Sequence, residues 1–500
     1  MDTMVLLAFI IYFIIVLAIG FVFYKKTSDM SDYFLGGRQM NPYVTAISAQ
    51  ASDMSSWLLM GLPASVMAAG LGKAWIGIGL AIGSYAAWLF AAKRLRKHSV
   101  VAGNSLTIPE FFSNRYKDEK GYLRLISSIV ILFFFVFYVA SGFQGCGIIF
   151  QTVFPGTSKG IAIAIGAIIV IAYTFMGGYK AVCWTDFVQG LLMVVVVVVV
   201  PLAAMGHLGG WSEVSTALDN VGFDNYLNLF YAEGEAMSAV VIISLLAWGL
   251  GYFGMPHILV RYMSIRNPEE VKVARKVSLV WIVIALAAAI MIGIVGRAYY
   301  MEVGPVAGFE DQEIFILMAG DLFPSLIAGF LFAAVMAAIM STADSQLLVA
   351  SSAIANDVLG KSKRFNLSEN TLMWVSRGVV ILIAIIAFFI SLYGGSDIMS
   401  LVDYAWAGFG AAFGPLMILS LFWKRMNLQG AIASMVVGAL VIILCEVFTL
   451  EASTGIYSLL PGFLIALIVG VVFALATPGP SKEIEDECDA AQVYEEPMQQ

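Results

Sequence analysis

The sequence is poor in charge, histidine and cysteine, and each scarcity excludes a class of protein. Only 12% of the 500 residues are charged and 60% are hydrophobic, whereas a soluble domain has about 25% charged residues. The three histidines and four cysteines form neither a Ser/His/Asp arrangement nor a metal-ligand spacing. We therefore expect a polytopic membrane protein that is not an enzyme.

Further absences narrow the class. No G-x-x-x-x-G-K-[ST] phosphate-binding loop occurs, which argues against a nucleotide-driven pump. No basic patch stands apart from the charges that flank the membrane, which argues against a nucleic-acid partner. We expect no appended soluble domain and no obligate protein partner. The first hydrophobic segment lacks a basic n-region and a cleavage site, so we expect a retained helix. The cysteines are expected to be unpaired: Cys146, Cys183, Cys445 and Cys488.

Long apolar runs predict an all-α fold with about 13 transmembrane helices, each needing about 20 residues. If the N-terminus lies outside and the C-terminus in the cytoplasm, 24 of the 27 lysines and arginines fall in cytoplasmic segments, as the positive-inside rule requires. This count assigns Arg261 to a cytoplasmic loop, 261–276. We expect a multi-pass protein of the plasma (inner) membrane. The predicted spans are 3–24, 41–70, 72–92, 124–153, 159–177, 184–207, 237–260, 273–300, 320–356, 371–394, 398–423, 428–449 and 457–477.

The second and seventh spans are interrupted. In span 41–70, Asp53 lies within a serine-rich polar run, and a carboxylate at membrane depth indicates a functional site. Span 237–260 contains Trp248-Gly-Leu-Gly-Tyr-Phe-Gly-Met-Pro256, which weakens helix continuity. Interrupted segments in matching positions of two halves point to a transporter binding site between inverted repeats. The alternative is that glycine and proline are simply common in membrane helices.

The interruptions suggest a division of the chain into two repeats with peripheral parts. One repeat comprises spans 2–6 and its inverted copy comprises spans 7–11. The acidic tail is expected to be disordered. The predicted segments are 1–40 (first peripheral helix and cytoplasmic loop), 41–208 (repeat 1), 237–423 (repeat 2), 424–477 (peripheral spans) and 478–500 (cytoplasmic tail).

The ninth span carries oxygen donors on one helical face. Ala338, Ser341, Thr342 and Ser345 are spaced i, i+3, i+4 and i+7. A hard cation such as sodium prefers oxygen ligands, and carbonyls freed between Ala51 and Met54 could complete a cage with these hydroxyls. The alternative is tight packing of small residues whose hydroxyls bond their own helix. Spacing alone does not separate the two.

The acidic and aromatic side chains likewise allow either a functional or a structural interpretation. Asp53 could neutralise a bound cation or hold a broken helix together. Asp186 lies near the cytoplasmic end of span 6, where a solvated helix-start aspartate is the ordinary explanation. Asp344 suits an exit path or a structural hydrogen bond. Trp248, Tyr252 and Pro256 recur every four residues and could form a wall for a small zwitterion, or serve only packing.

Several motifs resemble the sodium:solute symporter family over essentially the whole chain: Ser31-Asp-Tyr-Phe-Leu-Gly-Gly-Arg38, the run Gly177 to Gly190 and the Ser341-Thr342 pair. Within this family, three segments are most similar to sodium/proline symporters. They are Asp53-Met-Ser-Ser-Trp-Leu-Leu-Met-Gly-Leu-Pro63, Ser105-Leu-Thr-Ile-Pro-Glu-Phe-Phe112 and Trp248 to Arg261.

The resemblance implies a leucine-transporter-type core of two inverted five-helix repeats, with sodium and L-proline as cargo. It implies a coupling role for Asp53 and, as in some relatives, a second sodium site at Asp186 and Ser345. The implied ligands of the first sodium are Ala51, Met54, Ala338, Ser341 and Thr342. The residues implied at or near proline are Ser55, Trp57, Tyr138, Trp248, Tyr252 and Pro256.

Together these features predict sodium-driven uptake of L-proline by alternating access. The alternatives are another small solute such as an amino acid or a carboxylate, proton coupling through Asp53 and Asp186, a passive channel, or a sensor. A carboxylate substrate usually needs a basic partner, and spans 2, 7 and 9 as delimited contain none.

Overall fold

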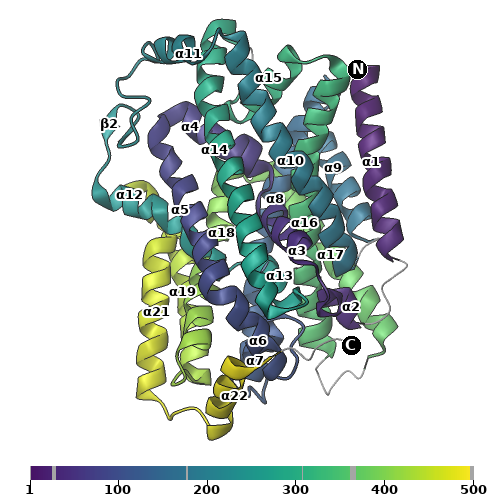
Figure 1. The fold of residues 1–500 in the computed structure, drawn as a ribbon, viewed down its shortest axis with the longest axis vertical. Helices are drawn as coiled ribbons and strands as arrows, with labels where there is room; N and C mark the ends of the chain where they lie inside the picture. The colour runs from purple at the N-terminus through teal and green to yellow at the C-terminus, as the bar shows by residue number, and fades with distance from the viewer. Residues whose placement is uncertain (1, 25–29, 176–177, 307, 361–366, 496–500) are drawn as a thin grey trace.

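The structure is a computed structural model that describes residues 2–24, 30–175, 178–306, 308–360 and 367–495. These residues form an almost entirely helical bundle (Figure 1). In the described part of the chain, ten helices are long and apolar enough to cross a membrane, and a bent pair supplies an eleventh. The expected number of 13 is therefore not confirmed. Predicted span 41–70 consists of short helical pieces, and span 159–177 contains a helix of only 16 residues.

The elements of the N-terminal half are α1 (Thr3–Tyr24), α2 (Met30–Leu35), η1 (Gly36–Arg38), α3 (Pro42–Asp53), η2 (Trp57–Gly61), α4 (Leu62–Ala69), η3 (Leu71–Lys73), α5 (Ala74–Ala86), η4 (Ala87–Ala92), α6 (Lys93–Val101), α7 (Ile108–Arg115), α8 (Tyr122–Val153), α9 (Lys159–Thr174), α10 (Tyr179–His207) and α11 (Trp211–Leu218). A small antiparallel hairpin, β1 (Tyr231–Ala232) and β2 (Glu235–Ala236), follows.

The C-terminal half contains α12 (Ala239–Leu246), η5 (Ala247–Phe253), α13 (Pro256–Ser264), η6 (Pro268–Glu270), α14 (Val271–Val303), η7 (Asp311–Glu313), α15 (Ile314–Leu322), α16 (Ser325–Ser352), η8 (Ala353–Gly360), α17 (Glu369–Tyr393), α18 (Ile398–Phe422), α19 (Leu428–Val447), α20 (Leu450–Thr454), α21 (Leu459–Ala476) and α22 (Lys482–Val493).

Both interrupted spans are broken helices, as the sequence predicts. Helix α3 begins at Pro42 behind Asn41, whose side chain accepts a hydrogen bond from the Tyr43 amide at 2.9 Å. It ends at Asp53 because Met54 leaves the helical region, with φ −86° and ψ 81°. The seventh span bends by 47° between Phe253 and Pro256. Proline fits the first turn of α13, where its missing amide costs nothing.

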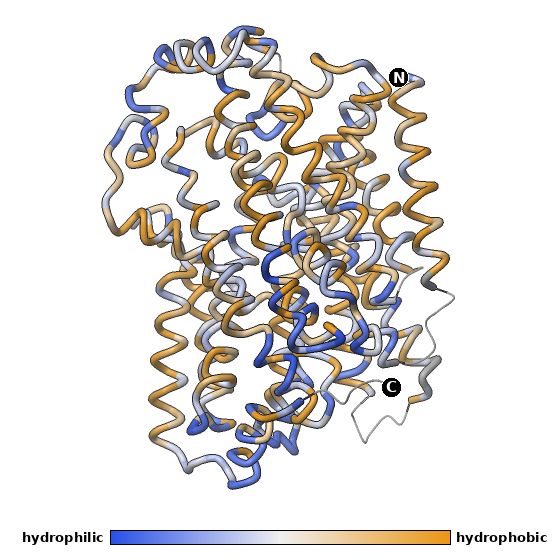
Figure 2. The backbone as a smooth tube through the Cα atoms, viewed as in Figure 1, coloured by the Kyte–Doolittle hydropathy of each residue, from blue (hydrophilic) through white to orange (hydrophobic). Residues whose placement is uncertain are grey.

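The broken helices lie in the middle of the bundle, and the outer helices face lipid. Helix α3 packs against α10, α13, α14 and α16 (Figure 1). Helix α16 is buried along nearly its whole length. Helices such as α1 and α21 instead carry apolar side chains outward, and polar residues gather at the ends of the molecule (Figure 2). A large exposed apolar surface is what contact with hydrocarbon requires.

The expectation of a disordered tail is wrong for its described part. Helix α22 packs against α6 and buries Ile484, Cys488 and Ala491. These three residues are spaced i, i+4 and i+7, so they form an apolar stripe within an otherwise acidic sequence. The cysteines match expectation: all four are buried and unpaired.

Candidate functional site

The break after α3 frees the backbone carbonyl of Asp53, and two side chains bind it. The Trp57 indole and the Tyr138 hydroxyl each donate a hydrogen bond to this oxygen at 3.0 Å. Trp57 lies on the continuation of the same span, whereas Tyr138 comes from α8. The unwound peptide is therefore fixed from two sides, as a buried backbone acceptor requires.

The Asp53 side chain is completely buried at this break. The Tyr252 hydroxyl, from η5 of the other broken span, donates a hydrogen bond to Oδ2. Oδ1 has no hydrogen-bond partner among the described residues. A buried carboxylate that lacks a full set of partners is costly, so a cation or a donor from a ligand would stabilise it.

The predicted sodium ligands on α3 and α16 lie next to each other. The Ser341 hydroxyl lies 2.8 Å from the Ala51 carbonyl oxygen and 3.2 Å from the Ala338 carbonyl oxygen. The Thr342 hydroxyl approaches the Ala51 oxygen at 3.4 Å. Met54 is buried at the same break. Four oxygens from two helices thus converge, and hard cations prefer oxygen donors of this kind.

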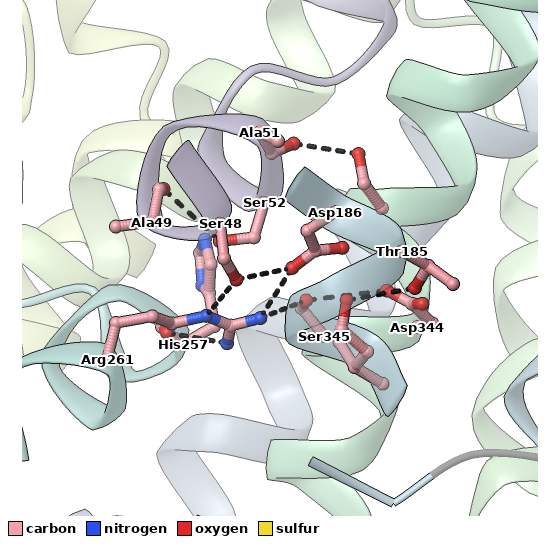
Figure 3. Close-up of polar contacts among 12 residues, drawn as sticks. Ser48, Ala49, Ala51, Ser52, Thr185, Asp186, His257, Arg261, Asp344 and Ser345 are labelled. Atoms are coloured by element: carbon pink, nitrogen blue, oxygen red, sulfur yellow. Dashed lines mark hydrogen bonds and ion pairs between the residues drawn. The ribbon is translucent and has the colours of Figure 1, made fainter. Parts of the chain in front are cut away.

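Asp186 and Ser345 also lie close together, but an arginine lies between them (Figure 3). Arg261 Nη2 donates to Asp186 Oδ2 at 3.0 Å and to the Ser345 hydroxyl at 2.6 Å. Ser48 donates to the same carboxylate oxygen at 2.7 Å. The buried arginine balances the charge of the buried aspartate and also donates to the Ser48 hydroxyl at 3.2 Å. The other carboxylate oxygen of Asp186, Oδ1, has no hydrogen-bond partner among the described residues.

This arrangement corrects two sequence-based interpretations. Arg261 is not a loop residue, because it lies within α13 and is 1% exposed. Asp186 is not a solvated helix-start residue, because it lies inside α10 with no exposed surface. Span 7 therefore does contain a basic residue at its end, although Asp186 already binds it. The Asp344 carboxylate accepts a hydrogen bond from the Ser345 hydroxyl at 3.3 Å.

The predicted substrate residues surround the break only in part. Trp57, Tyr138 and Tyr252 contact Asp53 as described, and Ser55 Oγ lies 3.5 Å from the Trp57 amide. Trp248 lies farther along η5, stacked on Tyr457 with ring centroids 4.9 Å apart. Pro256 is buried at the start of α13. The predicted set thus extends from Asp53 along the second broken span.

Sequence reasoning missed Trp406 of α18 and Tyr457, which precedes α21. The Trp406 indole donates to the Trp248 carbonyl at 2.8 Å and packs edge-on against Tyr252 at 5.2 Å. Neither residue lies in an interrupted span, and no local motif marks them. Only the packing of α18 and α21 against η5 reveals their proximity to the site.

The profile of the sodium:solute symporter family matches residues 33–438. The chain belongs to this family. It is 42% identical over 482 residues to the osmoregulated proline transporter OpuE of Bacillus subtilis, covering 96% of both proteins. It is 40% identical over 487 residues to the sodium/proline symporter of Escherichia coli, covering 97% of this chain and 95% of that protein. As a member of this family, the protein is a transporter of the membrane.

Solved structures support the fold of this family member. A sodium-coupled sialic acid symporter in a substrate-bound outward-open state superposes with a TM-score of 0.79 at 22% identity, covering 96% of this chain and 99% of that one. The nucleobase-cation symporter Mhp1 in a closed conformation superposes with a TM-score of 0.58 at 13% identity, covering 93% and 99%. The all-α fold with a leucine-transporter-type core is thereby confirmed.

Proposed function

We propose that this family member takes up L-proline together with sodium across the plasma membrane by alternating access. One observation carries the proposal: two hydroxyls of α16 converge on the carbonyl that precedes the break in α3. Relatives named as proline transporters, at 40 to 43% identity over nearly the full length, support the choice of solute. The distribution of lysine and arginine supports an outside N-terminus and a cytoplasmic C-terminus.

Sodium would bind between α3 and α16. Ser341 and Thr342 would turn their hydroxyl protons away from the Ala51 carbonyl and present oxygen lone pairs to the ion. The carbonyls of Ala51, Met54 and Ala338 would complete its coordination. Binding then joins the broken helix to α16 through the ion in place of direct hydrogen bonds.

The carboxylate of Asp53 couples this ion to the solute. It lies two residues beyond Ala51 and accepts a hydrogen bond from Tyr252 on the second broken span. A cation near the break therefore acts on both broken helices. Proline would bind along the aromatic side chains that follow, with Ser55, Trp57, Tyr138, Trp248, Tyr252 and Pro256 as its proposed neighbours.

The repeat division extends this proposal. Residues 41–208 and 237–423 would be the two inverted halves, and each contributes one broken helix to the site. Asp186 and Ser345 would form a second sodium site only if Arg261 moved away, because its guanidinium contacts both. We therefore propose one sodium per cycle at the α3–α16 site.

One sodium moved with a net-neutral zwitterion carries one positive charge inward. The membrane potential contributes about 2.3 kcal/mol per 100 mV to that movement. This free energy supports roughly 50-fold accumulation of the solute at about 1.4 kcal/mol per tenfold, before any sodium gradient is added.

The test is uptake of radiolabelled L-proline into proteoliposomes under imposed sodium, potassium or proton gradients. We expect accumulation only with inward sodium, and its loss in Asp53→Asn, because the amide cannot balance the ion's charge. Asp321→Asn is the matched control, since Asp321 also accepts from a tyrosine, Tyr299 at 3.2 Å, but lies exposed on α15. This control should transport normally.

The alternatives give different results in the same assay. Uptake driven by a proton gradient at constant sodium would show that the proton, and not sodium, is the coupling ion. Uptake of another solute but not of proline would support the symport mechanism and exclude proline as the substrate. Equilibration without any gradient requirement would contradict coupled transport altogether.

A further inference from the structure

A cavity of about 320 Å³ opens where α6 meets the tail helix α22. Leu89 and Phe90 of η4 line one side, and Gln492 of α22 lines another. The charged side chains in its wall are basic: Lys93, Arg94 and Lys97. A pocket of one sign concentrates ligands of the opposite sign.

The position of this cavity is at the edge of the membrane. Leu89 and Phe90 are 38% and 52% exposed, so they face hydrocarbon within the span Leu71–Val101. The basic residues follow one turn later, where that span leaves the bilayer. Arg94 also lies over the exposed ring of Phe422, 4.2 Å from its centroid. An occupant would therefore contact charge and an apolar rim at once.

Two of the three cations lack an acidic partner. Lys93 forms an ion pair with Glu269 at 2.5 Å. Arg94 and Lys97 make no ion pair with any carboxylate of the residues described here. The neighbouring tail helix is acidic, yet its carboxylates contact Lys117 and Lys424 instead. The cavity thus keeps uncompensated positive charge beside a negative helix.

We propose that this cavity binds the phosphate headgroup of an anionic phospholipid from the cytoplasmic leaflet. Arg94 and Lys97 hold the phosphate, and the acyl chains lie on Leu89, Phe90 and Phe422. Basic pockets between helices on the cytoplasmic side suit such headgroups. A lipid fits better than free phosphate because Leu89 and Phe90 give the rim an apolar side that faces the bilayer. This site is independent of the solute carried at the broken helices.

Docking of the tail helix completes the cavity, because Gln492 forms its outer wall. Helix α22 is fixed beside it by Arg115, which donates to the Cys488 sulfur at 2.7 Å. The exposed side chain of Gln492 can accept a larger group without disturbing the buried stripe of α22. A bulky residue at this position should therefore fill the cavity while leaving every cation in place.

The test uses native mass spectrometry of the purified full-length protein. Phosphatidylglycerol and phosphatidylcholine with identical acyl chains are titrated separately. We expect preferential binding of phosphatidylglycerol, weakened about 30-fold in Arg94→Gln/Lys97→Gln, since each cation near an anionic headgroup contributes about fivefold. Gln492→Trp should weaken binding as well. The matched control, Lys120→Gln/Lys276→Gln, removes two exposed basic residues elsewhere and should bind as the wild type does.

Three results would overturn the proposal. Wild-type affinity in Arg94→Gln/Lys97→Gln would mean that these side chains merely extend toward water, as basic residues at helix ends often do. Wild-type affinity in Gln492→Trp would place the lipid elsewhere. Displacement of the bound lipid by millimolar inorganic phosphate, with equal binding of phosphate alone, would make this a phosphate site instead.

Discussion

Ala51 and Asp53 are two positions apart on α3 and contribute different chemistry to one site. Ala51 contributes a backbone carbonyl, which accepts from Ser341 and Thr342 on α16. Asp53 contributes a carboxylate, which accepts from Tyr252 of η5. Because α3 ends at Asp53, the Ala51 carbonyl accepts no amide from a following turn and is available to partners outside the helix.

At this scale we predict that Ser341→Ala weakens sodium more than proline. Removing the hydroxyl deletes one oxygen donor, so the apparent sodium affinity should fall about tenfold, equivalent to about 1.4 kcal/mol. The KM for proline at saturating sodium should change by less than about threefold. Sodium-dependent uptake curves measure both.

Ser351→Ala is the matched control for this change. Ser351 lies on the same helix and is buried, but its hydroxyl donates only to the Leu348 carbonyl at 3.0 Å. It should leave sodium dependence unaltered. Equal losses in both variants would show that Ser341 acts through helix packing and not through the ion.

Among the elements, η5 depends on close backbone contact with α5. A Cβ on Gly83 would lie 2.1 Å from the Gly249 carbonyl oxygen, and a Cβ on Gly249 would lie 2.2 Å from the Gly79 carbonyl oxygen. Small residues four apart let helices approach in this way. The second broken span is thus held at a distance that only glycine permits.

We predict that Gly83→Ala destabilises the protein by about 1 to 3 kcal/mol, because backbone atoms cannot yield to the methyl group. It should also weaken proline binding by displacing Trp248 and Tyr252. Thermal unfolding of the purified protein and equilibrium binding of labelled proline measure these effects.

Gly378→Ala serves as the comparison for the glycine variant. Gly378 lies in helix α17 and a Cβ there would meet nothing within 4 Å. This substitution should be neutral or stabilising by up to about 1 kcal/mol, since alanine favours helix. Similar destabilisation by both changes would refute the role of close contact.

For the whole molecule, the tail helix joins distant parts of the chain at one end of the bundle. In Figure 1, α22 lies below α6 and α7. Lys117, after α7, pairs with Glu483 at 3.1 Å and with Glu487, while Lys424, after α18, pairs with Asp489. These pairs are partly exposed, so salt should weaken them.

We predict that raising the salt concentration from 0.05 to 1 M accelerates maleimide labelling of Cys488 about two- to fivefold, because screening releases α22. Partial burial lowers the pKa of Lys117, but hydrogen bonds to Glu487 and Glu483 outweigh it and the pKa is raised. The ion pairs of Lys117 therefore contribute fully to the docking of α22 at neutral pH. This contribution is lost as the pH rises through the raised pKa. Labelling is measured with Cys146, Cys183 and Cys445 replaced by alanine.

Lys117→Glu should accelerate labelling at low salt, whereas Lys120→Glu should not. Lys120 is exposed three residues away and forms no ion pair among the described residues. Labelling that is independent of both salt and Lys117 would show that the buried stripe alone holds the helix.

Local sequence features determined the helical membrane fold and the positions of the two broken spans. Apolar runs identified most of the membrane helices, because hydrocarbon imposes length and composition on each segment separately. They did not give the number, since 13 spans are expected from the sequence and the described residues contain ten, with an eleventh from the bent pair. The polar run around Asp53 and the glycines before Pro256 predicted both broken spans, since helix interruption is a local property. The spacing of Ser341 and Thr342 left cation binding and packing open. Which residues hold the ion and the solute stays a prediction.

Only the tertiary structure decided what surrounds those local features. The distribution of charge along the sequence places Arg261 in a loop, yet it lies buried between Asp186 and Ser345 because α10, α13 and α16 converge. Trp406 contacts Trp248 from a helix that no motif marks. The acidic tail forms a helix whose apolar stripe is buried where α22 packs against α6. Hydrophobicity is encoded residue by residue, but the partner of a buried charge or ring is set by residues far away in the chain, and only packing brings them together.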